Sequence, residues 1–248
     1  SAKQQSIQQL QKGVLLPAPH EELTPSGSSR NTVADLITGY GVAESIRHYY
    51  DIYGGALAGK RVLIQGWGNV ASAAACYLAH QGARVVGIID RVGGLLRPEG
   101  FRLEEIKELY NARSSNYLEA SELLSYEEIN EKIWDAGAEV FLPAAASRLL
   151  TREQVDRLLA GGLEVMASGA NVPFADQKIF YGPIASYAYS QLSCIPDSIS
   201  NCGMARVFAY LMKPGAEVSD QAIFQDVSEA IASALRKTHS QNPQPLEI

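Results

Sequence analysis

The feature that most constrains the fold is a βαβ pattern in residues 61–90. Arg61–Gln65 is a short apolar run with β-branched residues, which is typical of a buried parallel strand. A glycine-rich turn follows it, and the alanine-rich stretch 72–79 then predicts a helix. Residues 84–89 (RVVGII) predict a second buried strand, which leads into Asp90. A strand, a turn, a helix and a second strand in this order form one unit of a parallel sheet.

The turn in this unit, GWGNVA at residues 66–71, has the spacing of a dinucleotide-binding turn. Gly66 allows the sharp change of direction, Gly68 lets a pyrophosphate approach the backbone, and Ala71 keeps the helix close to the strand. The amides of Asn69 and Val70 are expected to point at the phosphates from the positive end of the helix. The alternative is a glycine turn that serves the fold alone. The strand before the turn and the helix after it favour a binding site.

Asp90 stands where this type of site places an acid. Its distance from Gly66 is near the spacing of about 20 residues expected for a carboxylate that binds the ribose hydroxyls. A carboxylate there favours NAD, because it repels the 2′-phosphate of NADP. Arg91 follows at once and could pair with that phosphate, or it could be a solvated surface residue. The residues therefore favour NAD as the cofactor and leave NADP open.

Strands and helices continue to alternate along the chain, which predicts an α/β fold. We expect a doubly wound Rossmann-type sheet with helices on both faces. Further strands are predicted at 139–142 and 163–167, and helices at 38–53, 103–110, 126–134, 151–161, from 203 onward, and 219–236.

The chain is expected to divide near residue 37. Residues 1–13 are polar and could form a frayed helix, whereas residues 17–30 hold three prolines and three serines, which is typical of an irregular connector. We therefore predict an N-terminal segment and connector over 1–37, and an NAD(P)-binding domain over 38–248.

Two loops of small residues follow predicted strands, at 143–146 (PAAA) and 168–171 (SGAN). In an open α/β sheet, ligands bind beyond the carboxyl ends of the strands. Small residues there leave space for a flat ring, and the Asn171 side chain could hold an amide group. Ordinary tight turns are the alternative for both loops.

Composition excludes several classes of protein. The chain carries 21 Lys and Arg against 27 Asp and Glu, a net charge of −6, which argues against nucleic-acid binding. No apolar stretch approaches the length of a membrane span, and the first residues lack the apolar core of a secretory signal. The three cysteines and four histidines are scattered, so neither a disulfide framework nor a metal site is expected. A cytoplasmic protein is predicted.

Five motifs, taken together, resemble those of the glutamate/leucine/phenylalanine/valine dehydrogenases. They are TGYGV (38–42), GWGNVAS (66–72), FLPAAAS (141–147), SGAN (168–171) and IPDSISNCG (195–203), in the same order as in that family. The resemblance implies oxidative deamination of an L-amino acid, such as glutamate or leucine, to a 2-oxo acid, with hydride passed to the nicotinamide.

The resemblance also implies roles for individual residues. Asp90 would bind the adenosine ribose, and Thr38 and Asn69 would lie along the cofactor. The nicotinamide pocket would be lined by Ala144, Ala145, Asn171 and Asn201.

The sequence departs from the family pattern in three respects. First, no glycine-rich segment with catalytic lysines precedes Gly66. Second, PAPH at 17–20 places His20 where the family has an aspartate that serves proton transfer, so His20 is a weak candidate for an acid or base. Third, Met204 replaces a glycine, and Phe208 stands at the position of a serine that contacts glutamate.

These departures predict a fragment that lacks the catalytic lysine domain, and that could assemble into oligomers through that missing domain. The alternative is a non-catalytic dinucleotide-binding or assembly module derived from the family. Glutamate becomes a doubtful substrate, and an amino acid with an apolar side chain fits Phe208 better.

Overall fold

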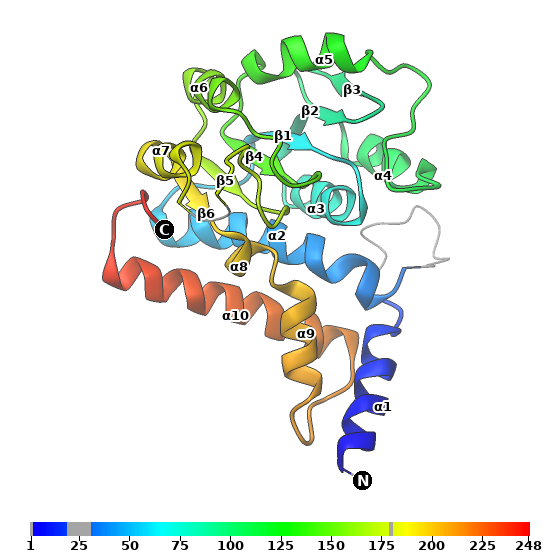
Figure 1. The fold of residues 1–248 in the computed structure, drawn as a ribbon. Coiled ribbons are helices and arrows are strands. Elements are labelled where there is room, and N and C mark those ends of the chain that lie inside the picture. The colour runs from blue at the N-terminus through cyan, green and yellow to red at the C-terminus, as the bar shows by residue number, and fades with distance from the viewer. Residues whose placement is uncertain (1, 19–30, 179–180) are drawn as a thin grey trace.

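Six strands form one sheet in the order β3-β2-β1-β4-β5-β6 (Figure 1). The computed structural model describes residues 2–18, 31–178 and 181–248. The strands are β1 (Arg61–Gln65), β2 (Arg84–Asp90), β3 (Gly93–Leu96), β4 (Val140–Pro143), β5 (Val165–Ala167) and β6 (Ser193–Ile195). The helices are α1 (Ala2–Val14), α2 (Val33–Tyr53), α3 (Asn69–His80), α4 (Leu103–Ala112), α5 (Tyr126–Lys132), the 3-10 helix η1 (Ile133–Asp135), α6 (Arg152–Ala160), α7 (Pro183–Gln191), α8 (Asp197–Ser200), α9 (Gly203–Leu211) and α10 (Asp220–Gln241).

Five of the strands run parallel, and this confirms the doubly wound sheet. β1 pairs in parallel with β2 and β4, and β5 pairs in parallel with β4 and β6. β3 alone is antiparallel and forms a hairpin with β2. β3 and β6 were not predicted from the sequence, because the four residues of β3 begin with two glycines and β6 has only three residues.

Helices cover both faces of the sheet, as predicted (Figure 1). The side chains of β1 alternate between the faces, with Val62 and Ile64 in one core and Leu63 in the other. The first core lies under α2, α3, α4, α9 and α10. The second lies under α5, η1, α6 and α7. This burial on both faces explains why β1, β2 and β4 are continuous apolar runs.

The helix predicted to begin near Thr38 begins at Val33 instead. The backbone N–H of Thr32 donates to the Asp35 carboxylate at 2.8 Å, which closes the first turn. Gly39 and Gly41 therefore lie inside α2, where glycine usually weakens a helix. A Cβ on Gly39 would stand 2.6 Å from the Ala73 Cβ, so this glycine lets α2 and α3 pack closely. The helix is continuous through residues 37 and 38, and the division of the chain into domains stays a prediction.

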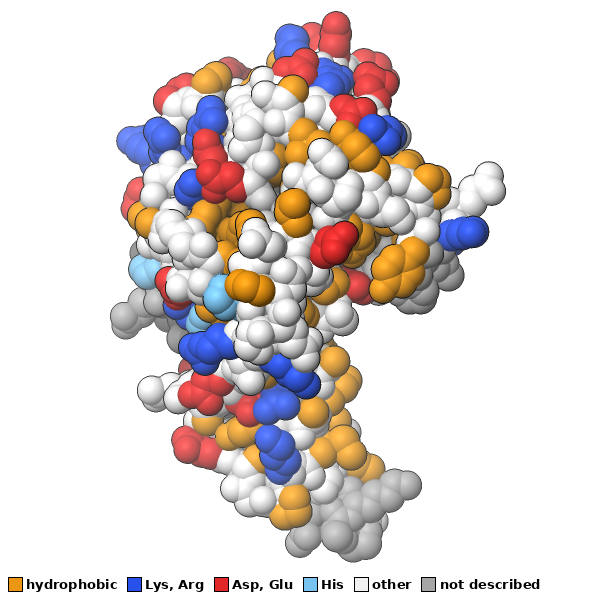
Figure 2. All heavy atoms as spheres, turned by 90° about the vertical axis from the view of Figure 1, so that its left-hand side faces the viewer, with side chains coloured by type: hydrophobic (Ala, Val, Ile, Leu, Met, Phe, Trp, Pro, Cys, Tyr) orange, Lys and Arg blue, Asp and Glu red, His pale blue; other side chains and the backbone are white. Residues whose placement is uncertain are grey.

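Side chains of opposite charge lie close together on one face of the molecule. Figure 2 shows Lys and Arg side chains beside Asp and Glu over one face of the molecule. Some of these pairs join neighbouring elements: Arg157 of α6 binds Asp135 of η1 at 2.8 Å, and Arg206 of α9 binds Asp226 of α10 at 2.5 Å. No helix in the ranges described above is long and apolar enough to cross a membrane.

A buried polar network joins α2 to α10. Glu44, 4% exposed, accepts hydrogen bonds from Arg47, Gln81 and Ser228, and the Ser228 hydroxyl also contacts His48 Nε2 at 2.9 Å. Burial raises the pKa of Glu44, but the hydrogen bonds from Arg47 and Ser228 outweigh it and hold the pKa below its usual value. Burial, followed by the charge of Arg47, lowers the pKa of His48.

We expect this network to make the fold sensitive to acid. Below about pH 6.5 the unfolded chain protonates His48 while the folded chain resists protonation, so the free energy of unfolding falls as the pH decreases. Glu44 adds to this loss below about pH 4.5, because its folded pKa is the lower one. Urea denaturation between pH 8 and pH 5 measures the slope. His48→Gln should flatten it, and an unchanged slope in that variant would contradict the assignment.

Candidate functional site

The predicted site residues lie along one edge of the sheet. Because β1, β2, β4, β5 and β6 are parallel, their carboxyl ends meet at the same edge. Gly66 follows β1, Asp90 ends β2, Ala144 follows β4 and Asn171 lies four residues beyond β5. Asn201 follows α8, the short helix after β6. Residues far apart in the sequence are therefore brought into one line.

Gly66 is held against the loop that follows β4. Its φ is +98°, and a Cβ built on it would lie 2.8 Å from the Ala144 carbonyl oxygen and from the Ala145 backbone nitrogen. Its own N–H donates to the Ile89 carbonyl at 2.7 Å. Only glycine satisfies both the left-handed conformation and the close approach. The turn after β1 and the loop after β4 thus touch through their backbones.

Gly68, in contrast to Gly66, lies beside open space. It is the N-cap of α3 with φ −81° and ψ −170°, and a Cβ built on it would meet no atom of the described chain within 4 Å. Gly68 has no side chain that could accept from the first amides of the helix, those of Asn69 and Val70. An open space thus faces the positive end of α3, and it suits a phosphate or pyrophosphate group.

Asp90 is buried and fixes a distant loop. One of its carboxylate oxygens accepts the backbone N–H of Leu118 at 2.7 Å, and the residue is 8% exposed. The neighbouring Arg91 is exposed, and its guanidinium carbon lies 5.4 Å from the centre of the Tyr117 ring. The Asp90 carboxylate therefore holds the segment after α4 in place. This segment lies at the end of the site where the adenosine is predicted to bind.

A second arginine lies beside the turn, and the sequence analysis missed it. Arg113, just after α4, donates from Nη1 to the Asn69 side-chain oxygen at 2.8 Å. Its guanidinium lies 5.2 Å from the centre of the Tyr110 ring. No motif or spacing in the sequence indicated this contact, because it depends on how α4 packs on α3. A cation thus stands next to the N-terminus of α3.

The two asparagines predicted for the nicotinamide pocket contact each other. The Asn201 side-chain amide donates to the Asn171 side-chain oxygen at 2.9 Å. The loop before Asn171 is tied to the end of β4, since the Pro143 carbonyl accepts from Gly169 and Ala170 at 2.9 Å each. Ala144 and Ala145 are half-buried beside them. These loops converge at the other end of the line from Asp90.

Thr38 lies on α2 between the starts of two other helices. A Cβ on Gly203, the first residue of α9, would stand 2.8 Å from the Thr38 Cα. A Cβ on Gly39 would stand 2.6 Å from the Val70 carbonyl oxygen in α3. Thr38 therefore stands near both the turn at Gly68 and the loop that carries Asn201.

The remaining candidates lie outside the described residues or on α9. His20 lies outside the described residues. Met204 is half-buried on α9, and Phe208 of the same helix is 43% exposed. Burial raises the pKa of the Cys202 thiol, beside Asn201, so the thiol stays protonated at neutral pH. Among the described residues, no group of three or more His, Cys, Asp or Glu is placed to hold a metal ion.

The fold is a doubly wound α/β sheet of the Rossmann type, with a line of loops along its carboxyl edge. The model of the Glutamate/Leucine/Phenylalanine/Valine dehydrogenase family matches residues 28–239. The chain therefore belongs to that family, and the resemblance seen in the motifs is confirmed.

Relatives and solved structures agree with this membership. A glutamate dehydrogenase of Aeropyrum pernix is 32% identical over 170 residues, and an NADP-specific glutamate dehydrogenase of Saccharolobus shibatae is 29% identical over 171 residues. Each match covers 67% of this chain and 37% of the relative, so the chain spans little more than a third of their length. The crystal structure of a hetero-hexameric glutamate dehydrogenase from Thermus thermophilus shares the fold, with a TM-score of 0.66 at 21% identity over 93% of this chain and 52% of that one.

Proposed function

We propose that the chain is the cofactor-binding part of an amino-acid dehydrogenase and that it holds a nicotinamide dinucleotide along the carboxyl edge of the sheet. The observation that carries the proposal is the open space at Gly68, in front of the uncapped N-terminus of α3. Asp90 on one side of this space, and the pair Asn171 and Asn201 on the other, support an extended ligand that crosses it.

Each group on this edge has a task in the proposal. The amides of Asn69 and Val70 bind the pyrophosphate. Asn171 and Asn201 orient the carboxamide, while Ala144 and Ala145 leave room for the ring. The bound dinucleotide supplies the hydride acceptor, so the protein needs only to bind, orient and exclude water.

We propose NADP as the preferred cofactor, although Asp90 alone favoured NAD. The carboxylate of Asp90 is buried and already accepts the N–H of Leu118, so it is less able to repel a phosphate outside. Two arginines, Arg91 and Arg113, stand near this end of the line. Several relatives, including those of Saccharolobus shibatae and a Psychrobacter species, are named NADP-specific glutamate dehydrogenases.

Calorimetric titration of NADP⁺ and NAD⁺ against the chain tests both proposals. We expect saturable binding of NADP⁺, and weaker binding of NAD⁺. Arg91→Gln combined with Arg113→Gln should weaken NADP⁺ by about 10-fold or more, because each charged hydrogen bond to a phosphate contributes about 1.5–3 kcal/mol. NAD⁺ should lose much less.

Arg84→Gln, at the other end of β2, is the matched control and should leave both affinities unchanged. Equal losses for NADP⁺ and NAD⁺ in the double variant would contradict the role of the arginines. Absence of binding by either dinucleotide would overturn the proposed function itself.

The reaction proposed for the whole protein is the oxidative deamination of an L-amino acid. Within the printed sequence, three lysines precede Gly66, and of these Lys60 pairs with Glu164 at 2.7 Å near the amino ends of the strands. We therefore propose that the substrate-binding lysines lie outside this chain. The exposed Phe208 on α9 supports an amino acid with an apolar side chain. The alternative is a non-catalytic binding or assembly module, which the departures at His20, Met204 and Phe208 favour.

A further inference from the structure

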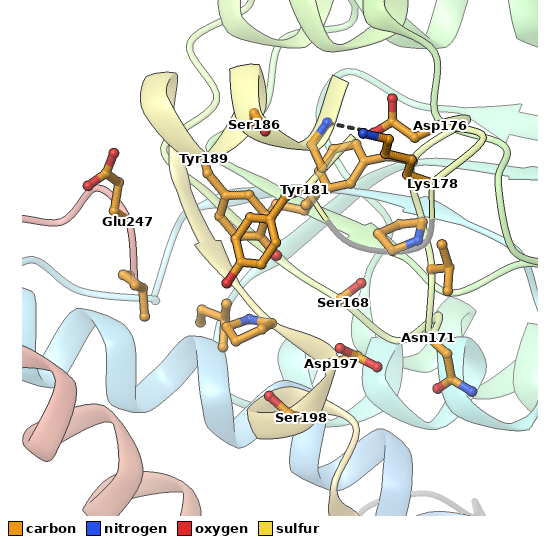
Figure 3. A pocket seen from close by; sticks show the side chains of 18 residues that line it. Ser168, Asn171, Asp176, Lys178, Tyr181, Ser186, Tyr189, Asp197, Ser198 and Glu247 are labelled. Carbon is orange, nitrogen blue, oxygen red and sulfur yellow. Dashed lines mark hydrogen bonds between the residues drawn. The ribbon is translucent and has the colours of Figure 1, made fainter. Parts of the chain in front are cut away.

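A hollow of about 800 Å³ opens at the carboxyl ends of β5 and β6, beyond the proposed nicotinamide end (Figure 3). Its walls come from the segment after Asn171, from α7 and from the start of α8. The volume suits a small organic molecule, since ligand pockets commonly measure about 300–1,000 Å³. Asn171, assigned above to the carboxamide, also lines this hollow, but the other residues that were given tasks do not.

Aromatic rings form much of the lining. Phe174 is buried, and its ring centre lies 6.2 Å from that of Tyr189 on α7. Tyr181 is 84% exposed and lines the same hollow. Figure 3 shows the Tyr181 and Tyr189 side chains next to each other on one side of it. Faces of aromatic rings attract cations and also accept apolar groups.

Asp197, whose carboxylate has no partner among the described residues, lines the same hollow as these rings. Within the described chain, Asp197 makes no hydrogen bond through its side chain and no ion pair, whereas both Asp176 oxygens accept backbone N–H groups at the start of α7. Burial, together with the nearby charges of Cys194 and Asp197, raises the pKa of Tyr189 to about 12. Asp197 and Tyr189 line the same hollow, and the tyrosine stays neutral at neutral pH.

The balance of charge around the hollow is negative. Lys178 is the one Lys or Arg among the described lining residues, and in Figure 3 it lies on the same side as Asp176. Asp197 and the exposed Glu247 lie away from it in that view. The charged residues that line the hollow therefore favour a cation over an anion.

We propose that this hollow binds an organic ammonium ion with an aromatic or aliphatic body. The ammonium donates to the Asp197 carboxylate, which has no partner among the described residues. The body of the ligand packs on Phe174 and Tyr189, and the Tyr181 ring covers it. This site does not depend on the proposed dehydrogenase function, because none of these contacts requires a dinucleotide.

Calorimetry of the full chain with phenethylammonium chloride at pH 7.5 tests the proposal. An alkylammonium ion keeps its charge at that pH, since amines of this kind have a pKa near that of Lys, about 10.4. We expect saturable binding, and none of 3-phenylpropionate, which has a similar body and the opposite charge. Asp197→Asn should weaken binding about 10-fold, whereas Glu127→Gln on α5, at the other end of the sheet, should not.

Two tyrosine variants separate ring contacts from the hydroxyl. Tyr189→Phe should bind like the wild type, and Tyr189→Leu should bind several-fold more weakly, with thermal unfolding showing that both are folded. Absence of binding by the wild type, equal binding of 3-phenylpropionate, or an unchanged affinity in Asp197→Asn would each overturn the proposal. Gly68→Val should retain this binding, which distinguishes the site from the dinucleotide site.

Discussion

Replacing Gly68 with valine is expected to abolish dinucleotide binding and to leave the fold intact. The φ and ψ of Gly68 are ones that any residue adopts, and a Cβ there meets nothing in the described protein within 4 Å. The branched side chain therefore fits the folded chain, but it fills the space in front of the first amides of α3, where the pyrophosphate is proposed to lie. We expect the affinity to fall by at least about 100-fold, or about 2.7 kcal/mol.

Calorimetric titration of NADP⁺ measures this loss, and thermal unfolding checks that the variant is folded. Gly68→Ala provides a graded comparison, because its single methyl group fills less of the same space and should cost less affinity. If Gly68→Val binds NADP⁺ as the wild type does, the pyrophosphate does not lie at this turn.

Replacing Gly66 with alanine should instead lower the stability of the fold. Its φ of +98° costs an L-residue about 1–2 kcal/mol, and the new Cβ would stand 2.8 Å from backbone atoms of Ala144 and Ala145. Crowding of a packed site adds about 1–3 kcal/mol. We expect the unfolding temperature to fall by about 10 °C, since each kcal/mol shifts a chain of this length by about 2–4 °C.

Gly162→Ala is the matched control for this prediction. Gly162 has a similar φ of +91°, but a Cβ there meets nothing described within 4 Å, so that substitution carries the backbone strain without the crowding. Differential scanning calorimetry of the two variants should show the larger decrease for Gly66→Ala. Equal decreases would mean that the contact with the loop after β4 contributes no stability.

The part of the fold that carries the site was largely predictable from the sequence. Residues 61–90 gave β1, α3 and β2 because each has its own pattern: an apolar run, a glycine turn and a stretch of small residues. The helix predicted over 219–236 begins as expected, because Ser219 is the N-cap of α10 and its hydroxyl accepts from the Ala222 amide at 3.2 Å. Patterns of this kind depend only on residues that are close together in the sequence.

The features that were missed depend on contacts between distant residues. The hydrogen bond from Arg113 to Asn69 exists because α4 packs on α3, and the one from Leu118 to Asp90 exists because the segment after α4 turns back to β2. The residues next to Arg113 and Leu118 in the sequence do not indicate either contact. The true start of α2 was missed because residues 33–37 were assigned to the connector, whereas the Asp35 carboxylate accepts the Thr32 N–H and closes the first turn of the helix there.

The contact between Gly66 and the loop after β4 sets a fixed distance along the edge of the sheet. It joins main chain to main chain, so no side chain can lengthen or shorten it. The region proposed for the phosphates and the region proposed for the nicotinamide are thus held at a fixed distance from each other by the backbone. Substitutions at Arg91 or Arg113 can change which cofactor is preferred, but a ligand of different length would require a new backbone path after β1 or β4.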